Sequence, residues 1–277
     1  MKLTDVSKTA IVTLRCHVIE SQKTNPLIKD PMAEYCLNRF VSLVSQTEPD
    51  QVFYRKLPTR LTNNITIRAR KYDAIINDFI SKHPNCTVVN LGCGFDTRYW
   101  RINNQHCQYI ELDLPEVIAI KKELLKDKLK FELIDRSVLD TSWIDQVTQK
   151  GNRNILLIAE GLLMYLEKDD VIHLLKTFAA RFDDSQIALE VVTEKYTKGF
   201  WKKIIILKMK KELGLEAGSS YNFGIKNAHE LETYGNGIQV INEWSTFEDP
   251  DIRPRIFKYL GLSRTQWTVT AAINHNR

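Results

Sequence analysis

The fold of this chain is decided by the stretch Thr87-Val88-Val89-Asn90-Leu91-Gly92-Cys93-Gly94-Phe95-Asp96-Thr97-Arg98. Its β-type apolar run leads into a Gly-x-Gly turn, and a second apolar run ends in Glu111-Leu112-Asp113. A strand, a glycine turn and an acidic strand end about 20 residues later are typical of the nucleoside-binding half of a doubly wound α/β domain. Glycines let a ligand approach the main chain, and carboxylates accept hydrogen bonds from ribose hydroxyls. The sequence therefore predicts a Rossmann-like α/β fold whose ligand contacts include Gly92, Gly94, Glu111 and Asp113.

Length and composition indicate one large domain. The chain has 277 residues, 43% of them hydrophobic and 26% charged, which is ordinary for a folded globular protein. No apolar run approaches the roughly 18 residues that a transmembrane helix needs. Residues 1–8 lack the apolar core of a signal peptide. We therefore predict a single domain over residues 1–277, with no membrane span and a cytoplasmic location.

The cysteine pattern predicts neither a metal site nor a disulfide framework. The five cysteines show no Cys-x-x-Cys spacing, and no histidine lies at a zinc-ligand spacing from them. Several lie in apolar contexts, where free thiols of a reducing compartment are commonly buried. Cys93 lies between the turn glycines, but the sequence places no partner base near it, which a nucleophilic thiol would require.

The excess of positive charge is concentrated in one segment. The net charge is +5, and a dense basic stretch runs from Lys195 to Lys211 with aromatic and aliphatic residues between the lysines. Three interpretations compete: a helix that packs on the domain with its lysines solvated, a membrane-surface helix, and a nucleic-acid patch. The first is favoured because the apolar residues suffice to pack against a domain and the basic cluster is not repeated. We therefore predict no nucleic-acid partner.

The region before the glycine turn, residues 1–85, is predicted to consist of helices. One begins at Pro31 with Asp30 as its N-cap and ends at Pro49-Asp50. A longer helix covers about Leu61 to Lys82. His83-Pro84-Asn85 ends it just before the first strand.

Strands and helices alternate over residues 86–194, the predicted cofactor-binding core. Strands are expected at 86–91, 108–112, 130–134, 154–159 and 186–192, and helices at 115–125, 140–148 and 169–182. The continuous apolar run at 154–159 is typical of a central parallel strand. The core is therefore expected to be a parallel sheet.

The alternation ends after Glu194. Residues 195–236 are charged and predicted to be helical, with a glycine-containing loop at 214–220. Residues 237–277 carry two late strands, 238–244 and 265–272, with a helix near 252–259 between them. Five β/α units, a helical insertion and two late strands predict a seven-strand sheet, with N-terminal helices and a helical lid formed by residues 195–236.

The glycine turn lacks the third glycine of a dinucleotide site. In the pattern Gly-x-Gly-x-x-Gly that glycine lets helix and strand pack closely around a pyrophosphate, and Thr97 occupies its position here. No Walker sequence for a nucleoside triphosphate occurs either. A nucleoside without a pyrophosphate fits better, and S-adenosylmethionine is such a ligand. A nicotinamide-dependent oxidoreductase is the alternative, and Thr97 disfavours it.

Three motifs follow predicted strands: 90–98, 111–115 and the run Ala159-Glu160-Gly161-Leu162-Leu163-Met164-Tyr165-Leu166. In combination they resemble the leucine carboxyl methyltransferase family, and the resemblance extends over most of residues 7–195. That family includes enzymes that methylate the C-terminal leucine of a protein phosphatase, and bacterial relatives of the tetracenomycin polyketide O-methyltransferase type. The resemblance implies an S-adenosylmethionine-dependent O-methyltransferase.

The resemblance also implies roles for individual residues. Arg68 would bind the methionyl carboxylate of the cofactor with its planar guanidinium, and Lys8 would share that task. Gly92 would contact the cofactor through its main chain, Asp113 would bind the ribose, and Glu160 would contact the cofactor's amino group. The alternatives are that Arg68 belongs to a solvated helix face and that Glu160 caps the following helix.

The adenine contacts depart from the family pattern. The family often has an Asp-Leu-x-Asp run after the third strand, and the aligned stretch here reads Ser137-Val138-Leu139-Asp140. We expect Ser137 and Val138 to contact the adenine, although Asp135 is an alternative.

The expected chemistry is direct displacement, in which the enzyme aligns an oxygen nucleophile with the activated methyl group. A carboxylate acceptor is already ionised at neutral pH, whereas a phenol or alcohol needs a general base. The sequence identifies no catalytic residue: His173 and Tyr165 are weakly placed as bases, and Arg98 or Tyr196 as groups that orient an acidic acceptor. The acceptor, a small molecule or a peptide terminus, stays open, as does the oligomeric state. A binding protein that has lost catalysis is a further alternative.

Overall fold

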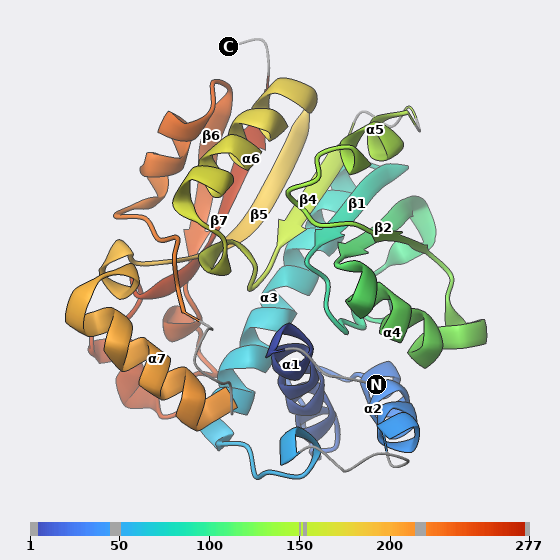
Figure 1. Ribbon diagram of the computed structural model, residues 1–277, viewed down its shortest axis with the longest axis vertical. Coiled ribbons are helices and arrows are strands. Elements are labelled where there is room, and N and C mark those ends of the chain that lie inside the picture. Colours follow the sequence, from blue (N-terminus) through green and yellow to red (C-terminus); the bar gives the residue numbers. More distant parts are fainter. Residues whose placement is uncertain (1–4, 45–50, 150, 152–153, 214–219, 275–277) are drawn as a thin grey trace.

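The computed structural model describes residues 5–44, 51–149, 151, 154–213 and 220–274. Its centre is a seven-strand sheet with helices on both faces (Figure 1). The strands are β1 (Cys86–Leu91), β2 (Cys107–Asp113), β3 (Glu132–Asp135), β4 (Ile155–Ala159), β5 (Ser185–Val192), β6 (Ile238–Trp244) and β7 (Gln266–Ile273). Across the sheet their order is β3-β2-β1-β4-β5-β7-β6. The predicted Rossmann-like α/β fold with seven strands is confirmed.

Strand direction divides the sheet into two parts. The first five strands are parallel to one another, as strands joined by long crossovers are. The strand order reverses between β1 and β4, and ligands of doubly wound folds bind at such a point. β7 is antiparallel to both β5 and β6 and lies between them.

Helices pack on both faces of the sheet, because the strands carry apolar side chains on both faces. Successive residues of a strand point to opposite faces, so Val89 and Leu91 of β1 face one layer and Val88 faces the other. The first layer contains α5 (Trp143–Thr148), α6 (Lys168–Arg181) and the 3-10 helix η7 (Ala228–Tyr234). On the other face, α3 (Thr59–Lys82) packs through a row of buried apolar side chains.

The N-terminal helices form a second core. α1 (Asp5–Ser21) and α2 (Pro31–Val44) pack with α4 (Pro115–Leu125) around Phe40 and Phe95. The predicted N-cap is confirmed, because the Ala33 N–H donates to Asp30 Oδ1 at 3.0 Å. The structure describes the helix as far as Val44, and the predicted end at Pro49-Asp50 lies outside the described residues.

Several predicted boundaries are corrected. β3 begins at Glu132 rather than at residue 130, because the chain before it turns through η4 (Lys126–Lys128). α5 begins at Trp143 rather than at 140, since Asp140 accepts the N–H of Ser142 in a local turn. The helix near 252–259 is η9 (Arg255–Tyr259), which begins only after Pro254 because a proline disfavours helix in the residue before it.

The segment 195–236 is less helical than predicted. It contains η6 (Glu194–Thr197), α7 (Gly199–Leu213) and η7, but residues 220–227 are not helical. There the N–H groups of Asn222 and Phe223 donate to the Met164 carbonyl, so the chain follows the core instead of coiling. Residues 214–219 of the predicted loop lie outside the described residues. The remaining 3-10 helices are η1 (Gln51–Phe53), η2 (Arg98–Trp100), η3 (Asn104–His106), η5 (Leu163–Tyr165) and η8 (Thr246–Glu248).

Two further predictions can be compared with the structure. All five cysteines are free, and only Cys107 is not fully buried. Among the helices that the structure describes, none has both the length and the apolar character needed to cross a bilayer.

Candidate active site

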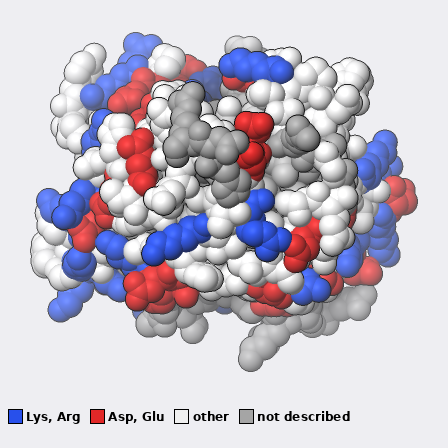
Figure 2. Space-filling model, turned by 90° about the horizontal axis from the view of Figure 1, so that it is seen from above, with Lys and Arg blue, Asp and Glu red and all other residues white. Residues whose placement is uncertain are grey.

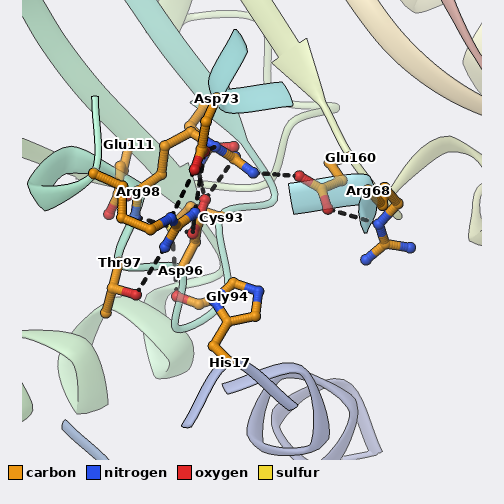
Figure 3. Close-up of polar contacts among 12 residues, drawn as sticks. His17, Arg68, Asp73, Cys93, Gly94, Asp96, Thr97, Arg98, Glu111 and Glu160 are labelled. Atoms are coloured by element: carbon orange, nitrogen blue, oxygen red, sulfur yellow. Dashed lines mark hydrogen bonds and ion pairs between the residues drawn. The ribbon is translucent and has the colours of Figure 1, made fainter. Parts of the chain in front are cut away.

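The predicted site residues meet at the carboxyl edge of the parallel strands. Gly92 and Gly94 follow β1, Asp113 ends β2 and Glu160 follows β4. Arg68 comes from α3, and Figure 3 shows it in contact with Glu160. The structure therefore gathers these residues, which are far apart in the sequence, at one place.

The glycine turn is shaped by neighbouring side chains. Gly92 and Gly94 have φ values of +63° and +50°, a region that L side chains rarely adopt. A Cβ on Gly94 would lie 3.0 Å from the Cβ of Ala10 in α1, and one on Gly92 would lie 2.8 Å from Leu162 Cδ1. The N-terminal helix therefore covers the turn at Gly94, while the flexible side chain of Leu162 lies against Gly92.

Asp113 is held by the turn that it supports. Its Oδ2 accepts the Gly94 N–H at 2.6 Å and its Oδ1 accepts the Leu114 N–H at 2.7 Å. Burial raises the pKa of this carboxyl, and the two backbone donors oppose that shift. Since each carboxylate oxygen has a second lone pair, Asp113 can also accept a hydrogen bond from a ribose hydroxyl.

The prediction that Glu111 contacts the ribose is corrected. Glu111 lies deeper in β2 and is wholly buried, and Lys121 of α4 places its Nζ 2.5 Å from Glu111 Oε2. This is an ion pair without hydrogen-bond alignment, because neither Glu111 oxygen has a hydrogen-bond partner among the described residues. Burial raises the pKa of Glu111 to about 7, although Lys121 opposes it. A side chain enclosed in this way cannot reach a ligand.

Arg68 faces inward, so the alternative of a solvated helix face is wrong for it. Its Nε donates to Glu160 Oε1 at 2.6 Å, and its Nη1 donates to Glu190 Oε2 at 3.0 Å. Its Nη2 donates to no described residue and would lie 3.9 Å from a Cβ on Gly161. One guanidinium nitrogen next to Gly161 is thus available to an anionic ligand.

Glu160 binds two arginines instead of capping a helix. Its second oxygen accepts Arg98 Nη2 at 2.5 Å. Burial disfavours the charge, but Arg98 and Arg68 outweigh burial and hold the pKa of Glu160 below its usual range. Glu160 is therefore ionised at neutral pH and suited to an ammonium group.

The ion pair of Arg68 with Glu160 is connected to a buried network of charged side chains (Figure 3). Arg98, only 1% exposed, also binds Asp73 and Asp96. Arg101 binds the same two carboxylates and Asp30, the cap of α2. Each nitrogen of the Arg98 guanidinium binds a carboxylate, so the structure gives this side chain a role in the network rather than in orienting an acceptor. The network fixes the position of Glu160 before any ligand arrives.

The other predicted cofactor-binding residues, Ser137, Val138 and Lys8, lie near the same edge of the sheet. Among the described residues, the structure shows no bond between them and Arg68. Asp113 is the register partner of Asp135 in β3, and Ser137 and Val138 follow that strand. Ser137 Oγ accepts the Leu139 N–H, and the Val138 carbonyl accepts Trp143 Nε1. Lys8 is half-buried in α1, the helix that covers the glycine turn.

Sequence reasoning missed Glu190 and Tyr221, and it named Tyr165 and Tyr196 without predicting that they form one cluster with Tyr221. Glu190 interrupts the apolar run of β5, and a charged residue inside a buried strand was the signal that could have identified it. Tyr165, Tyr196 and Tyr221 pack with Ile205 and Met209 of α7.

The class of protein follows from comparison with known sequences. Residues 10–179 match the family model described as leucine carboxyl methyltransferase. The chain is 28% identical over 266 residues to the tetracenomycin polyketide synthesis O-methyltransferase TcmP of Streptomyces glaucescens, covering 94% of this chain and 91% of that protein. It is 23% identical over 250 residues to an S-adenosyl-L-methionine-dependent methyltransferase of Gibberella zeae, covering 86% of this chain and 81% of that protein. A leucine carboxyl methyltransferase 1 of Debaryomyces hansenii is 26% identical over 70% of this chain and 57% of its own length.

The protein is an S-adenosylmethionine-dependent methyltransferase. It belongs to the leucine carboxyl methyltransferase family, as the sequence motifs predict. The comparisons support neither a nicotinamide-dependent oxidoreductase nor a protein without catalysis.

The described residues fit the cofactor. Its methionyl end carries a carboxylate and an ammonium group, and the site offers the available Nη2 of Arg68 next to the ionised Glu160. Its ribose carries two hydroxyls, for which the carboxylate of Asp113 is an acceptor.

Proposed function

We propose that this enzyme transfers the methyl group to a carboxylate oxygen of a small molecule or a chain terminus. The groups beside Arg68 that could act as a general base include two carboxylates and two tyrosines. Glu160 is bound by two arginines, and Glu190 by Arg68 and Gln266. Burial raises the pKa of Tyr165 to about 12 and that of Tyr221 well above its usual value. Burial raises the pKa of Glu190, but Arg68 and Gln266 bind its oxygens. Because both carboxylates are held by these partners and both tyrosines stay protonated at neutral pH, an acceptor that is already ionised is favoured.

We also propose that the acceptor carries an apolar or aromatic body. Tyr165 and Tyr221 pack edge to face, with ring centroids 5.6 Å apart, and α7 covers them with Ile205 and Met209. Glu190 and Arg68 are close enough to shift the pKa of both tyrosines. The aromatic cluster thus lies between the lid helix and the charged pair. The name of the Streptomyces relative, an O-methyltransferase of tetracenomycin polyketide synthesis, supports this proposal.

For the cofactor we propose contacts that follow the predicted site. Arg68 and Lys8 bind the methionyl carboxylate, Glu160 the ammonium group, and Asp113 the ribose. Gly92 and Gly94 contact the cofactor through their main chain, and Ser137 and Val138 contact the adenine. The whole chain forms one domain in which residues 195–236 act as the lid. A cytoplasmic location and the lack of a nucleic-acid partner stay predictions.

In this mechanism the protein mainly positions the cofactor and the acceptor. The cofactor supplies a methyl group that its positively charged sulfur already activates. Arg68 and Glu160 hold the methionyl end, and the Arg98 network prevents Glu160 from moving. α1 and α7 exclude water from two sides, which strengthens these charged contacts. The acceptor oxygen then forms the new bond to carbon as the carbon–sulfur bond breaks.

The cofactor contacts are tested by calorimetry with S-adenosylmethionine and its demethylated product. Arg68→Ala should weaken binding of both about 10- to 100-fold, because a hydrogen bond to a charged group contributes about 1.5–3 kcal/mol. Arg70→Ala is the matched control, since Arg70 lies on the same helix but binds Asp249 and Asp251. Equal affinities of the Arg68→Ala variant and the wild type would contradict the assignment.

The acceptor class is tested by a methyl-transfer screen of carboxylates, phenols and peptide C-termini, read by release of the demethylated product. With a carboxylate the rate should be flat above about pH 6, because the acceptor is ionised there. Transfer confined to phenols, with a rate that rises toward pH 9 or so, would show that a base was overlooked.

A further inference from the structure

The outer face of α7 combines exposed apolar side chains with lysines. Phe200, Lys203, Leu207 and Lys210 recur at helical spacing, and Phe200 and Leu207 are 71% and 67% exposed. The inner face of the same helix is anchored through Ile205 and Met209. The helix is therefore held by one side while the other side presents large apolar groups and lysines to the solvent.

The lysines on this outer face lack the acidic neighbours that surface lysines often have. Lys203 and Lys210 form no ion pair with any residue that the structure describes. Lys195 instead lies over the ring of the half-exposed Trp201, with its Nζ 4.1 Å from the ring centroid. Positive charge and apolar surface are thus combined at one place.

A second segment, η9, has the same character. Ile256, Tyr259 and Leu260 are all exposed, Tyr259 to 84%. The stretch 253–264 contains four basic residues, Arg253, Arg255, Lys258 and Arg264, and no acidic residue, and only Arg264 among these four forms an ion pair within the described residues, with Glu243 of β6. Such a combination in two separate segments is unusual for a surface that faces only water.

The topology puts both segments at the same edge of the sheet. β7 is antiparallel to β5 and to β6, so β5 and β6 run in the same direction. α7 follows β5 and η9 follows β6, so both lie beyond the carboxyl ends, the edge where the glycine turn and Arg68 lie. Figure 1 shows α7 at the lower left of the molecule. The end opposite that edge, seen from above in Figure 2, mixes basic and acidic side chains.

We propose that α7 and η9 dock this enzyme on a bilayer that contains anionic lipids. Lys203, Lys210 and Lys258 would contact lipid phosphates, while Phe200 and Leu207 would enter the boundary between headgroups and acyl chains. Because α7 packs on the domain through Ile205 and Met209 and exposes Phe200 and Leu207 on its other side, it carries apolar groups on two faces. The exposed Phe and Leu side chains can enter a membrane interface while the neighbouring lysines contact anionic lipids. Docking in this orientation places the edge of the sheet that carries the active site toward the membrane.

The chemistry favours a lipid surface over other partners. A second copy of this chain would bring lysines against lysines, which opposes self-association through this face. Nucleic acid would satisfy the lysines and stack on aromatic rings, but it would leave Leu207, Ile256 and Leu260 without an apolar partner. An anionic bilayer satisfies both kinds of group.

The test is flotation of the full-length protein with vesicles of phosphatidylcholine, alone or mixed with phosphatidylglycerol. Binding should require phosphatidylglycerol and weaken with salt. The variant Lys203→Glu/Lys210→Glu should bind at least about tenfold more weakly, since one basic residue near an anionic surface contributes about 1 kcal/mol. Leu207→Ser should weaken binding while keeping the salt dependence. The matched control Lys130→Glu/Lys176→Glu carries the same charge change on exposed residues of other elements.

Calorimetry with S-adenosylmethionine shows whether each variant is folded, so that lost vesicle binding is not a folding defect. The proposal is overturned if the protein ignores both kinds of vesicle, binds both equally, or loses binding equally in the control variant. Self-association that depends on Leu207, seen by sedimentation without vesicle binding, would assign the surface to a second copy instead. The readout is independent of the methyl acceptor, so it stands apart from the proposed function.

Discussion

The edge of the sheet that carries the active site has two regions, which differ in whether their basic side chains are buried and paired or exposed. Around β1, β2 and β4, the arginines are buried and each binds two or more carboxylates. On α7 and η9, basic residues are exposed beside apolar side chains. The first region holds its geometry without a ligand, whereas the second leaves basic and apolar groups exposed, where a partner could bind them. The comparison teaches that binding of the cofactor and contact with a partner surface are separated within one fold.

The largest expected effect is in the buried region. Arg98→Ala removes one of the two arginine partners of each of Asp73, Asp96 and Glu160, and leaves these buried carboxylates with less compensating charge. We expect a loss of about 3–5 kcal/mol in the free energy of unfolding, measured with urea. Arg136→Ala, which breaks an exposed pair with Asp140, should cost less than about 1 kcal/mol. Similar losses in the free energy of unfolding for the two variants would contradict the contrast between buried and exposed charges.

A smaller effect is expected for the isolated buried pair. Lys121→Met leaves Glu111 without its ion-pair partner, at an expected cost of about 2–3 kcal/mol at pH 7. The cost is limited because Glu111, with a pKa of about 7, can take up a proton. A carboxyl whose pKa is raised on folding loses its stabilising contribution as the pH rises, so this variant should be less stable at pH 8 than at about pH 5. The double variant Lys121→Met/Glu111→Leu should recover stability and lose that pH dependence.

Acid unfolding should report the network. Burial opposes the charge of Asp96, but Arg98 and Arg101 outweigh it and hold the pKa of this carboxyl well below its usual range. Stability from Asp96 is therefore present above its unfolded pKa of about 3.9 and is lost as the pH falls toward its folded pKa. Asp96→Asn should flatten the decline in stability below about pH 4, an effect on the order of 2 kcal/mol. An unchanged acid profile would show that other groups control it.

The smallest expected effect is in the exposed region. Leu207→Ser should change the free energy of unfolding by no more than about 0.5 kcal/mol, because its side chain is mostly in water. Thermal unfolding of this variant, compared with Met209→Ser on the inner face, would sharpen the contrast between the two sides of α7. A large loss for Leu207→Ser would show that the outer face is packed in solution.

Much of the fold could be predicted because its signals are local. Apolar runs predict the strands, and the Asp30-Pro31 pair predicts the start of α2. Grouping of Arg68 with Glu160 rests on family resemblance, and the structure brings them into contact. Contacts such as that of Arg68 with Glu190, 122 residues away, depend on strand order and could not be read from spacing.

The errors in the candidate site have the same origin. Glu111 and Asp113 look equivalent in the sequence, but only the packing of Lys121 against β2 reveals that Glu111 is enclosed. Arg98 looks available near the top of the sheet until its three carboxylate partners are known. A charged residue in a motif can serve the ligand or the scaffold, and only the tertiary structure distinguishes the two.

The position of β7 has a consequence for synthesis on the ribosome. In the described sheet, β6 neighbours β7 and no other strand, and β5 shares its second edge with β7. Until the residues up to Ile273 have emerged, β5 exposes an unpaired edge and β6 has no strand to join. At about 5–20 residues per second this interval lasts seconds, long enough for a nascent chain to pair with other unfolded chains. The last strand is therefore the step that commits the newly made protein to its native state.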